Sequence, residues 1–586
     1  MKIVHSYIPL IVISAALVFI SSSVGQVVFP ALSKYALDVI IPGHSVDKLS
    51  QLVVITVVIF LSTGIVKIAQ NYISTRVRFG AMLKLFARVY KKSLSIDTAK
   101  NPQYTNGYFL QLNVDDSYAA TTALVSGLST ALIGVAQVIL YTALCAWQSV
   151  EITFLALALF PLNIVFWILS ARYVRPAEKE YQKTGINRKQ HIISTMEQLA
   201  TIKSFDAGLL LSSYYKKLLH NTARLGWSVW GKKNIVTAAS TFTGFLQFGV
   251  ILYALYFVII GRITIGTFAA ASLYLSALSG AFGTLFGQVN QLISDTIAME
   301  RLLDMNMHLD TSQKFSPRSK LATDTLRKAD SPQYTGPVIS TKELSFSYGG
   351  KSLALDAVSL AIPAKALYGI TGPTGSGKST LAALWAGLQT LSYTGSLTLR
   401  GIEYSTIAPK DIRRHVAIVQ QNPQLLPCSI LENMTIGKSA KDNKARLLCR
   451  EFSISDTIEQ LPEGYNTVVS AAPFPLSWGQ IQIVAIIRGI LQNPDFLILD
   501  EPTSALDAAT AQMLFSVLAR ERADKATVLI SHKISFISSC EKIAVLCGGK
   551  LCGFGSHDEL LSTTPLYQTS ARADHENVEM VWNKTA

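Results

Sequence analysis

The stretch Gly372-Pro373-Thr374-Gly375-Ser376-Gly377-Lys378-Ser379-Thr380 decides the fold of the C-terminal half of the chain. It follows the apolar run Ala366–Ile370, which is typical of a buried strand, and it precedes Leu381–Trp385, which begins a helical pattern. Glycines in such a loop let successive backbone N–H groups point at one centre, and the N-terminus of the following helix adds partial positive charge. The stretch therefore predicts a loop that binds the phosphates of a nucleoside triphosphate.

Two side chains extend the chemistry of this loop. Lys378 can neutralise the outer phosphates, and the Ser379 hydroxyl can ligate Mg²⁺. The alternative is an ordinary glycine-rich turn without a ligand. We favour the phosphate-binding loop because the glycine spacing, the Lys-Ser pair and the two flanking elements all agree.

A second apolar strand supplies two carboxylates. Phe496–Leu499 is followed directly by Asp500 and Glu501, and the further apolar strands Thr527–Ile530 and Ile543–Leu546 alternate with helical stretches. That pattern predicts an α/β domain with a largely parallel sheet, in which carboxylates at a strand's end point into the crevice of the phosphate loop. An aspartate there can hold Mg²⁺ through water, and a glutamate beside it can orient or deprotonate the attacking water.

The N-terminal half has the composition of a membrane domain. Of the 586 residues 49% are apolar, and nearly all of the long apolar runs lie before residue 300. Six runs are long enough to cross about 30 Å of hydrocarbon as helices of about 20 residues. They are Tyr7–Leu32, Leu52–Ile73, Tyr118–Trp147, Ile152–Ala171, Val236–Ile260 and Ile265–Leu292. The sequence therefore predicts six transmembrane helices, and the first is interpreted as a retained helix rather than a cleaved signal peptide.

The connections between these runs differ in length and charge. Three are short, whereas Arg76–Lys100 and Arg172–Lys233 are long and rich in Arg and Lys. By the positive-inside rule the two long connections are cytoplasmic, and so are both termini. We therefore attribute the formal net charge of +14 to membrane topology rather than to nucleic-acid binding. Apolar residues at a spacing of three and four in both connections predict helices that continue beyond the bilayer.

Several polar residues lie in or near the predicted membrane helices. Polar groups are costly in lipid and usually face other helices or a water-filled cavity. We expect each of them to contact a neighbouring helix, and as a group they suit a pathway for an amphipathic compound. These residues are Lys67, Gln137, Asn163, Gln247, Gln288 and Asn290.

The composition changes again after the last apolar run. From about Asp304 to Thr335 the chain becomes polar and irregular, which predicts a linker, and the alternating segment Leu344–Tyr348 then opens the second domain as a strand. We divide the chain into a transmembrane domain (1–303), a linker (304–337) and a nucleotide-binding domain (338–586). The six cysteines have no paired metal-ligand spacing and are expected to be reduced, structural thiols.

One further motif identifies a family. Leu476-Ser477-Trp478-Gly479-Gln480, placed shortly before Asp500, is similar to the Leu-Ser-Gly-Gly-Gln signature of ABC transporters. The whole chain resembles an exporter-type half-transporter, because Thr201–Phe205 also resembles the exporter loop that docks on the nucleotide-binding domain. The resemblance implies a membrane α-helical domain with six transmembrane helices, followed by an α/β phosphate-loop domain that hydrolyses ATP with Mg²⁺ to drive transport.

The resemblance also implies roles for single residues. Tyr348 would stack on adenine, and Gln421 would touch Mg²⁺ and sense the membrane domain. Glu501 would be the general base, and His532 would contact the γ-phosphate. The remaining implied ATP contacts are Gly372, Pro373, Thr374, Gly375, Ser376, Gly377, Lys378, Ser379, Thr380, Ser477, Gly479 and Gln480, and the implied Mg²⁺ ligands are Ser379, Gln421 and Asp500.

In this family two nucleotide-binding domains close face to face, and each ATP lies between one chain's phosphate loop and the other's signature. The resemblance therefore implies a second half-transporter as partner, in a lipid membrane. We place that membrane as the plasma membrane, the inner membrane of a bacterium.

Three departures from the family lie around the signature. Trp478 replaces a glycine, Ile483 stands where an arginine is usual, and Ser470-Ala471-Ala472-Pro473 replaces the usual Gly-Glu-Arg-Gly. A bulky ring beside backbone amides that approach the γ-phosphate would narrow the approach, because glycine is used where backbone must come close. We therefore favour a heterodimer with one weak site over a homodimer in which Trp478 turns outward.

Three functions remain open from the sequence. The first is ATP-driven export of an amphipathic compound, such as a peptide, a lipid or a drug-like metabolite. The second is import of a siderophore or metabolite by the same fold, and the third is an ATP-gated channel or regulator. The sequence does not choose among substrates, because packing among the six helices and their partner copies sets the cavity.

Overall fold

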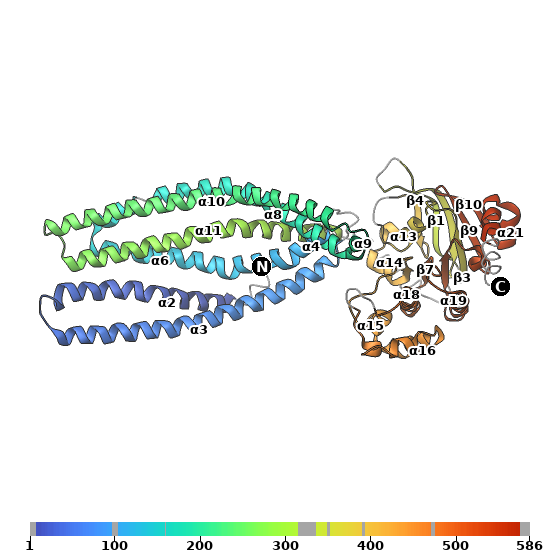
Figure 1. The fold of residues 1–586 in the computed structure, drawn as a ribbon, viewed down its shortest axis with the longest axis horizontal. Coiled ribbons are helices and arrows are strands. Elements are labelled where there is room, and N and C mark those ends of the chain that lie inside the picture. Colours follow the sequence, from blue (N-terminus) through green and yellow to red (C-terminus); the bar gives the residue numbers. More distant parts are fainter. Residues whose placement is uncertain are drawn as a thin grey trace. The chain divides into compact units, whose positions relative to one another are not determined.

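The computed structural model describes residues 8–96, 104–158, 160–313, 336–348, 352–389, 393–469 and 475–574. The chain divides into two compact units, Met1–Gln313 and Lys314–Ala586. Figure 1 shows that the first unit consists of long helices and that the second contains the strands. Each unit is described by itself below.

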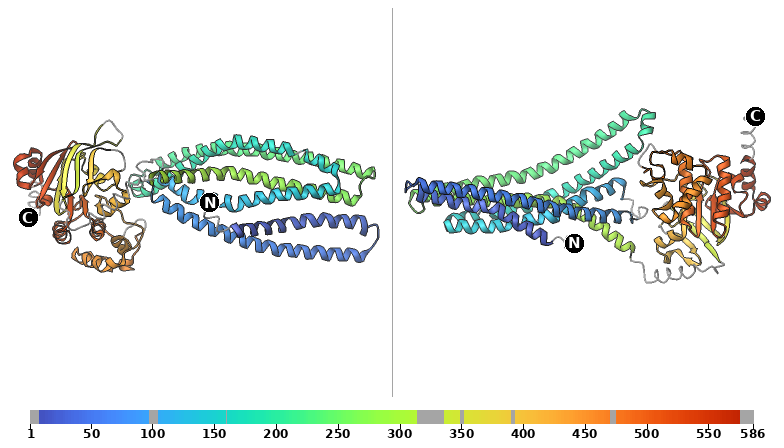
Figure 2. Two further views of the ribbon diagram at one scale, coloured as in Figure 1. Left: turned by 180° about the vertical axis from the view of Figure 1, so that it is seen from behind. Right: turned by 90° about the horizontal axis from the view of Figure 1, so that it is seen from below.

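Within the described residues, the first unit makes six helical passes, as predicted. The helices are α2 (Ile8–Tyr35, extended by the π-helical turn η1, Ala36–Ile40); α3 (Val46–Ser93); α4 (Asn106–Leu110), η2 (Gln111–Asp116), α5 (Ser117–Thr122), η3 (Ala123–Gly127) and α6 (Leu128–Gln148), which form one pass; α7 (Val150–Leu157) and α8 (Phe160–Glu197); the short α9 (Leu199–Ser204); α10 (Gly208–Ile259); and α11 (Ile265–Gln313). In Figure 2, α8 and α10 leave the other helices over part of their length.

Several helices are longer than a bilayer requires. α3, α10 and α11 contain 48, 52 and 49 residues, more than twice the roughly 20 that cross the hydrocarbon. The Arg- and Lys-rich connections thus continue the membrane helices, as their periodicity predicts. Within the described residues four helical stretches have the length and composition of a membrane span. These are Pro9–Ile40, Val46–Ser93, Asn106–Gln148 and Ile265–Leu285.

Polar side chains join the passes to one another. The Gln137 amide donates to Ser22 Oγ over 2.8 Å, and the Tyr274 hydroxyl donates to the Val27 carbonyl over 3.0 Å. Gln247 donates to the Leu275 carbonyl. The predicted contacts between helices are therefore found for Gln137 and Gln247, whereas the Lys67 side chain is exposed. The side chains of Asn163 and Asn290 lie outside the described residues.

A buried ion pair ties three passes together. Arg301 of α11 donates through Nε and Nη2 to the two oxygens of Asp116, both over 2.7 Å, and through Nη2 to Gln182 of α8 over 2.9 Å. Asp116 is only 1% exposed. Two parallel bonds between a guanidinium and a carboxylate fix the mutual orientation of the groups. We call this set the Asp116–Arg301–Gln182 brace.

The predicted linker needs a correction at its start. Residues 304–313, expected to be irregular, continue helix α11 to Gln313. Their polar composition does not end the helix, because a helix that has already formed adds residues at little cost. Residues 314–335 lie outside the described residues, and the domain division at residue 303 stays a prediction.

The part of the second unit that the structure describes contains two sheets. The strands are β1 (Pro337–Phe346), β2 (Leu355–Pro363), β3 (Ala366–Thr371), β4 (Thr394–Leu399), β5 (Ile402–Glu403), β6 (Val416–Val419), β7 (Phe496–Asp500), β8 (Ala526–Ile530), β9 (Lys542–Cys547) and β10 (Lys550–Gly555). One sheet has the order β2-β1-β4-β5 and is antiparallel. The other has the order β10-β9-β3-β8-β7-β6 and is parallel except for β10, which confirms the predicted parallel core.

Helix α13 (Lys378–Trp385) joins the two sheets in one core. Its Leu381 and Trp385 are fully buried in a cluster that contains Phe346 from the antiparallel sheet and Phe496 from the parallel one. The rings of Trp385 and Phe496 meet edge to face, with centroids 5.5 Å apart. This packing fixes the axis of the helix that follows the phosphate loop.

The other helices surround the parallel sheet. They are α14 (Pro409–His415), α15 (Ile430–Thr435), α16 (Asp442–Glu451), α17 (Ser455–Glu459), α18 (Trp478–Gln492), α19 (Ala508–Glu521), α20 (Ile534–Ile537) and α21 (His557–Thr563), with 3₁₀ turns at Tyr404–Thr406, Ser439–Lys441 and Gly464–Asn466. α18 carries a nearly continuous apolar sequence because its residues from Ile481 to Ile487 are buried. The core of this layer includes Leu497 and Leu499 of β7.

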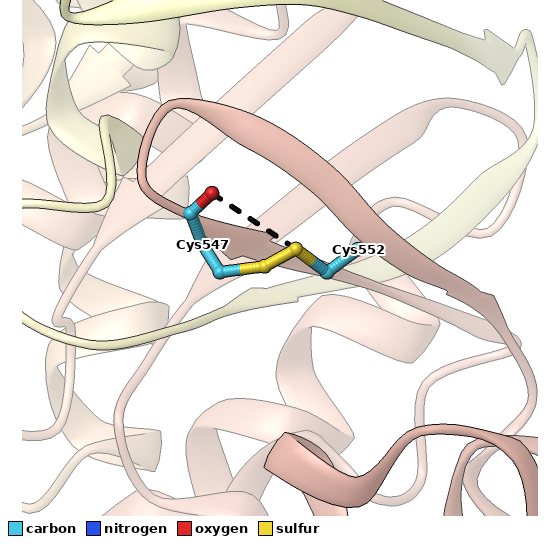
Figure 3. The surroundings of a disulfide bond; sticks show 2 residues. All are labelled: Cys547 and Cys552. Atoms are coloured by element: carbon cyan, nitrogen blue, oxygen red, sulfur yellow. Dashed lines mark hydrogen bonds between the residues drawn. A yellow bond between two sulfur atoms is a disulfide. The ribbon is translucent and has the colours of Figure 1, made fainter.

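The expectation of reduced cysteines is wrong for one pair. Cys547 at the end of β9 and Cys552 in β10 form a disulfide across the hairpin, with their Cα atoms 6.0 Å apart (Figure 3). The pairing shifts register between Leu551 and Gly553, so that Cys552 lies diagonally opposite Cys547. That Cα separation is within the range that disulfides span. The other four cysteines are free.

Candidate nucleotide site

The carboxyl ends of three neighbouring strands meet beside the phosphate loop. The Ser531 N–H donates to the Ile370 carbonyl over 3.0 Å, and the Glu501 N–H donates to the Ile530 carbonyl over 2.9 Å. These bonds align the ends of β3, β8 and β7. The residues that follow the three strands are Gly372, Ser531 and Glu501, so the topology brings the phosphate loop, the His532 segment and the two carboxylates to one edge of the sheet.

At two glycines of the loop no residue with a side chain would fit. Gly372 has a φ of 148°, and a Cβ there would lie 2.0 Å from the carbonyl oxygen of Leu546. Gly377 has a φ of 96°, and its Cβ would lie 2.5 Å from the carbonyl oxygen of Ala354. Both the backbone conformation and the close approach exclude a side chain. The loop is therefore held between the β9–β10 hairpin and the start of β2.

The Lys378 side chain folds back over this loop. Its Nζ donates to the carbonyl oxygens of Gly372 over 2.7 Å and of Pro373 over 2.9 Å. The residue is only 7% exposed. Burial lowers the pKa of Lys378, and the nearby Glu501 and Asp500 oppose that shift. The ammonium group thus lies at the mouth of the loop, where an anion would replace the two carbonyls as its partner.

The carboxylates face the loop and the histidine. The Ser379 hydroxyl is hydrogen-bonded to Asp500. Oε1 of Glu501 lies 3.2 Å from Nε2 of His532. Glu501 has a φ of 52°, the left-handed region that non-glycine residues seldom adopt. Such a conformation at a strand's end turns the chain sharply and sets where the carboxylate points.

Burial raises the pKa of both carboxylates. For Asp500 the hydrogen bond from Ser379 and the charges of Lys378 and His532 act in the opposite direction. For Glu501 the charge of His532 lowers the pKa, whereas the neighbouring Asp500 raises it. Desolvation is the largest cause in each case. A raised pKa makes a carboxylate a better proton acceptor near neutral pH.

A pH profile tests this electrostatic arrangement. If Glu501 accepts a proton in the rate-limiting step, the ATPase rate falls on acidification, because only the ionised form is active. Since its pKa is raised, this fall is expected at a higher pH than an ordinary glutamate would give. The measurement is kcat against pH at saturating Mg²⁺, which keeps protonation of Asp500 from limiting the rate. An acid limb at the pKa of a free glutamate side chain would contradict it.

The other implied ATP contacts lie around this centre. The Tyr348 hydroxyl donates to Thr380 Oγ1 over 3.2 Å, and half of the tyrosine side chain is exposed. Gln421 is exposed and follows β6, the neighbour of β7. Arg488 donates to the carbonyl of Gln424 over 3.0 Å, three residues after Gln421. Arg488 was not predicted, because the sequence does not show that α18 packs beside this segment.

The signature residues form the N-terminus of α18. The Ser477 hydroxyl accepts from the Gln480 N–H, and the Gln480 side chain accepts from the Ser477 N–H over 2.8 Å, which is a capping box. A Cβ at Gly479 would lie 2.7 Å from the carbonyl oxygen of Ala505. Trp478, the first residue of the helix, is 48% exposed. Gln480 therefore caps the helix here, and the indole of Trp478 reaches solvent. Ser470–Pro473 lie outside the described residues.

Comparisons with known proteins find a matching family model for each of the two units. The model of the ABC transporter family matches residues 355–504, and the model of the ABC transporter transmembrane region matches residues 12–282. The chain is 25% identical over 571 residues to "Multidrug resistance-like ATP-binding protein MdlB" of Buchnera aphidicola, with 95% of this chain and 94% of that protein covered. It is 25% identical over 560 residues to "ATP-dependent lipid A-core flippase" of Thiobacillus denitrificans, with 92% and 91% covered.

A solved structure shares the fold. The structure of a bacterial Atm1-family ABC exporter with ATP bound superposes with a TM-score of 0.78 at 20% identity and covers 97% of each chain. The two family models lie in the order membrane region, then ATPase. The chain therefore belongs to the ABC transporters: it is an exporter-type half-transporter with a multi-pass membrane domain fused to an ATPase domain that is coupled to transport.

Proposed function

We propose that this half-transporter hydrolyses ATP at Glu501 and uses the energy to export an amphipathic compound from the cytoplasm. The observation that carries the proposal is the gathering of Lys378, Asp500, Glu501 and His532 at one edge of the parallel sheet. Each type of group that phosphoryl transfer needs is present there: loop amides, a cation, a base and a metal-ligand pair.

Roles follow from the positions of the side chains. Lys378 and the loop amides bind the phosphates, and Glu501 holds the attacking water and accepts its proton. His532 exchanges its contact with Glu501 for one with the γ-phosphate. Tyr348 offers its exposed ring to the adenine.

The same site suits Mg²⁺. Ser379 and Asp500 present two oxygen donors already within hydrogen-bond distance of each other, and oxygen donors are what Mg²⁺ prefers. Gln421, on the adjacent strand end, is the third candidate ligand. When bound, Mg²⁺ neutralises charge that develops on the phosphates. Within the described residues no group of three His, Cys, Asp or Glu side chains could hold a metal ion.

A partner chain is needed because a half-transporter carries one of the two ATPase domains. Exposed aromatic residues on α10, with Trp227 at 78% and Trp230 at 66%, support a membrane-domain contact as well. We propose that the partner is a different half-transporter, since the bulky, solvent-facing Trp478 occupies the surface that would meet the partner's ATP. The weak site would be formed by the signature of this chain and the partner's phosphate loop, whereas the site at this chain's own phosphate loop would be intact.

Restoring glycine at Trp478 tests the weak site. In the native assembly, Trp478→Gly is expected to raise the ATPase rate by about tenfold, or about 1.4 kcal/mol of recovered transition-state stabilisation. The reason is that glycine lets the backbone approach the nucleotide. Trp478→Leu, which keeps a bulky side chain, is the matched control and should leave the rate low. An unchanged rate and nucleotide occupancy in Trp478→Gly would overturn the weak-site proposal.

The substrate class rests on the membrane domain and on the relatives. Those relatives are named for multidrug resistance and for flipping of lipid A core, both of which involve amphipathic molecules. We propose the same class here, in a bacterial plasma membrane with both termini cytoplasmic. The Arg- and Lys-rich extensions of α3, α8 and α10 support this orientation.

The first experiment is the ATPase rate of this chain purified alone in lipid nanodiscs, beside Glu501→Gln. Robust turnover that the substitution abolishes would support ATP hydrolysis at Glu501 and a self-sufficient homodimer, and would overturn the heterodimer. Negligible turnover in a folded, ATP-binding preparation would support a missing partner. Turnover that survives the substitution would overturn Glu501 as the base. Uptake into inverted vesicles compared with whole cells then separates export from import.

A further inference from the structure

We infer that the Cys547–Cys552 pair is a redox-responsive element that controls the affinity of the phosphate loop for nucleotide. The inference rests on the proposed ATP site and adds a regulatory input to it. It starts from the hairpin in Figure 3, in which the disulfide closes a ring around the turn Gly548–Gly549. That turn is part of the wall of the phosphate loop.

Backbone contacts connect the turn to the loop. The Gly549 N–H donates to the carbonyl of Ser376 over 3.2 Å, and the Gly549 carbonyl accepts from the Asp356 N–H over 2.8 Å. One residue before Cys547, the carbonyl of Leu546 lies against Gly372, where there is no room for a Cβ. The hairpin therefore touches the loop at both of its ends, without an intervening side chain.

Without the bridge, the hairpin pairing and the two hydrogen bonds of Gly549 hold the turn, and its two glycines give it more conformational freedom than other residues would. Gly548 and Gly549 have φ values of 55° and 82°, and glycine visits many other conformations at similar energy. A disulfide between Cys547 and Cys552 restricts those alternatives by closing the chain into a short ring. The ion pair between Lys550 and Asp356, 3.1 Å, is exposed and adds little to this restraint. Oxidation thus holds Gly549 where it donates to Ser376.

The pair is accessible to exchange. Cys552 is exposed and Cys547 half-buried, whereas Cys145, Cys449 and Cys540 are buried. Burial also raises the pKa of Cys449 and Cys540, which keeps these thiols unreactive. A small disulfide in solution can therefore reach the hairpin in preference to the core thiols.

The chemistry is thiol–disulfide exchange with a low-molecular-weight disulfide as the oxidant. The Cys552 thiolate attacks one sulfur of the small disulfide, forms a mixed disulfide and releases one small thiol. The Cys547 thiolate then attacks the Cys552 sulfur, which forms the Cys547–Cys552 bond and expels the second small thiol. Two electrons pass from the protein pair to the small disulfide, and the two protons end on the two released thiols.

The consequence is a nucleotide affinity that depends on the redox state. In the oxidised form the turn holds the loop in the shape described above, ready for phosphates. In the reduced form the turn and loop must be ordered when ATP binds, which weakens binding. We expect the Kd for ATP to rise by about fivefold on reduction, the lower end of couplings measured between distinct sites.

The test uses the full-length chain in nanodiscs, with Glu501→Gln to prevent hydrolysis. One sample is treated with oxidised glutathione and the other with dithiothreitol, and the Kd of a fluorescent ATP analogue is measured in competition with ATP. Alkylation and mass spectrometry count free thiols, with four expected after oxidation and all six after reduction. The Cys547→Ser/Cys552→Ser variant should lose the redox response, and Cys428→Ser, away from the hairpin, should retain it.

The outcomes separate this inference from the proposed ATP site. An affinity difference of about fivefold that disappears only in the double serine variant supports the inference. Equal affinities in both forms, or failure of oxidised glutathione to form the bond, would overturn it and leave the ATP site standing. Because the comparison uses one unaltered hairpin in two redox states, it does not depend on whether the double variant folds. Absence of binding in both forms would overturn the ATP site and this inference together.

Discussion

Replacing Glu501 by glutamine is expected to lower the ATPase rate of the assembled transporter by about 10²–10⁴-fold. The carboxylate follows β7 and lies beside His532 at the mouth of the phosphate loop. Glutamine has the same size and can still accept a hydrogen bond, but it cannot take a proton from water. ATP affinity should stay within about twofold, because Lys378 and the loop amides are untouched. Single-turnover hydrolysis and the ATP Kd in nanodiscs measure the two effects separately.

Glu521 provides a matched control for this substitution. It is a glutamate in the same domain, at the end of α19, and its partners are Lys444 and Arg520 rather than the nucleotide site. Glu521→Gln should leave the hydrolysis rate unchanged. If Glu501→Gln kept its rate within about tenfold of the native chain, another group would have to act as the base.

Replacing Gly372 by alanine is expected to lower ATP affinity by about 100-fold or more, or about 3 kcal/mol. The added Cβ would lie 2.0 Å from the Leu546 carbonyl oxygen, so the loop must move away from β9. The φ of 148° is also unfavourable for alanine. Both effects displace the amides that would bind phosphate. The Kd of a fluorescent ATP analogue gives the result, and thermal unfolding shows whether the domain itself is destabilised.

Gly375→Ala separates the two effects. Gly375 has a φ of 81°, but no atom lies within 4 Å of its Cβ position. This variant meets only the backbone strain, about 1–2 kcal/mol, and should lose about tenfold in affinity. Equal damage in Gly372→Ala and Gly375→Ala would mean that contact with the hairpin does not matter for the loop.

The parts that were predicted correctly depend on short, local patterns. β3, the phosphate loop and α13 follow one another within twenty residues, and the chemistry of the loop requires that order. β7 was recognisable because it is a short apolar run that Asp500 and Glu501 follow directly, and all of its residues are buried. The membrane helices were recognisable from long apolar runs, since the bilayer sets their minimum length. The sequence also predicted that Asp500 and Glu501 lie at the same edge of the sheet as the phosphate loop, which agrees with the strand pairing.

The antiparallel sheet was mostly missed, and in β1 the reason is that the strand lacks a regular alternation. β1 changes register against β2 at three places, so that buried and exposed residues follow each other irregularly. Within β1 and the residues that follow it, only the segment from Leu344 to Tyr348 alternates clearly enough to be read as a strand. Such bulges depend on the partner strand and are not visible in one strand alone.

Contacts between distant segments account for the remaining differences. The bond between Cys547 and Cys552 depends on a bulge in β10, so their separation of five residues has no meaning until the register is known. Arg488 reaches the segment after Gln421 only because α18 packs across it. In each case the decisive partner is set by tertiary packing.

The Asp116–Arg301–Gln182 brace has a mechanical consequence. Three long helices that were joined only at the membrane would bend independently. A displacement at the far end of one helix would then be absorbed by bending of that helix. The buried bidentate ion pair and the bond to Gln182 instead stiffen the three helices as a group, because these bonds must break before the helices can slide past one another. A displacement of any one of these three helices should therefore be transmitted almost fully to the membrane-spanning part.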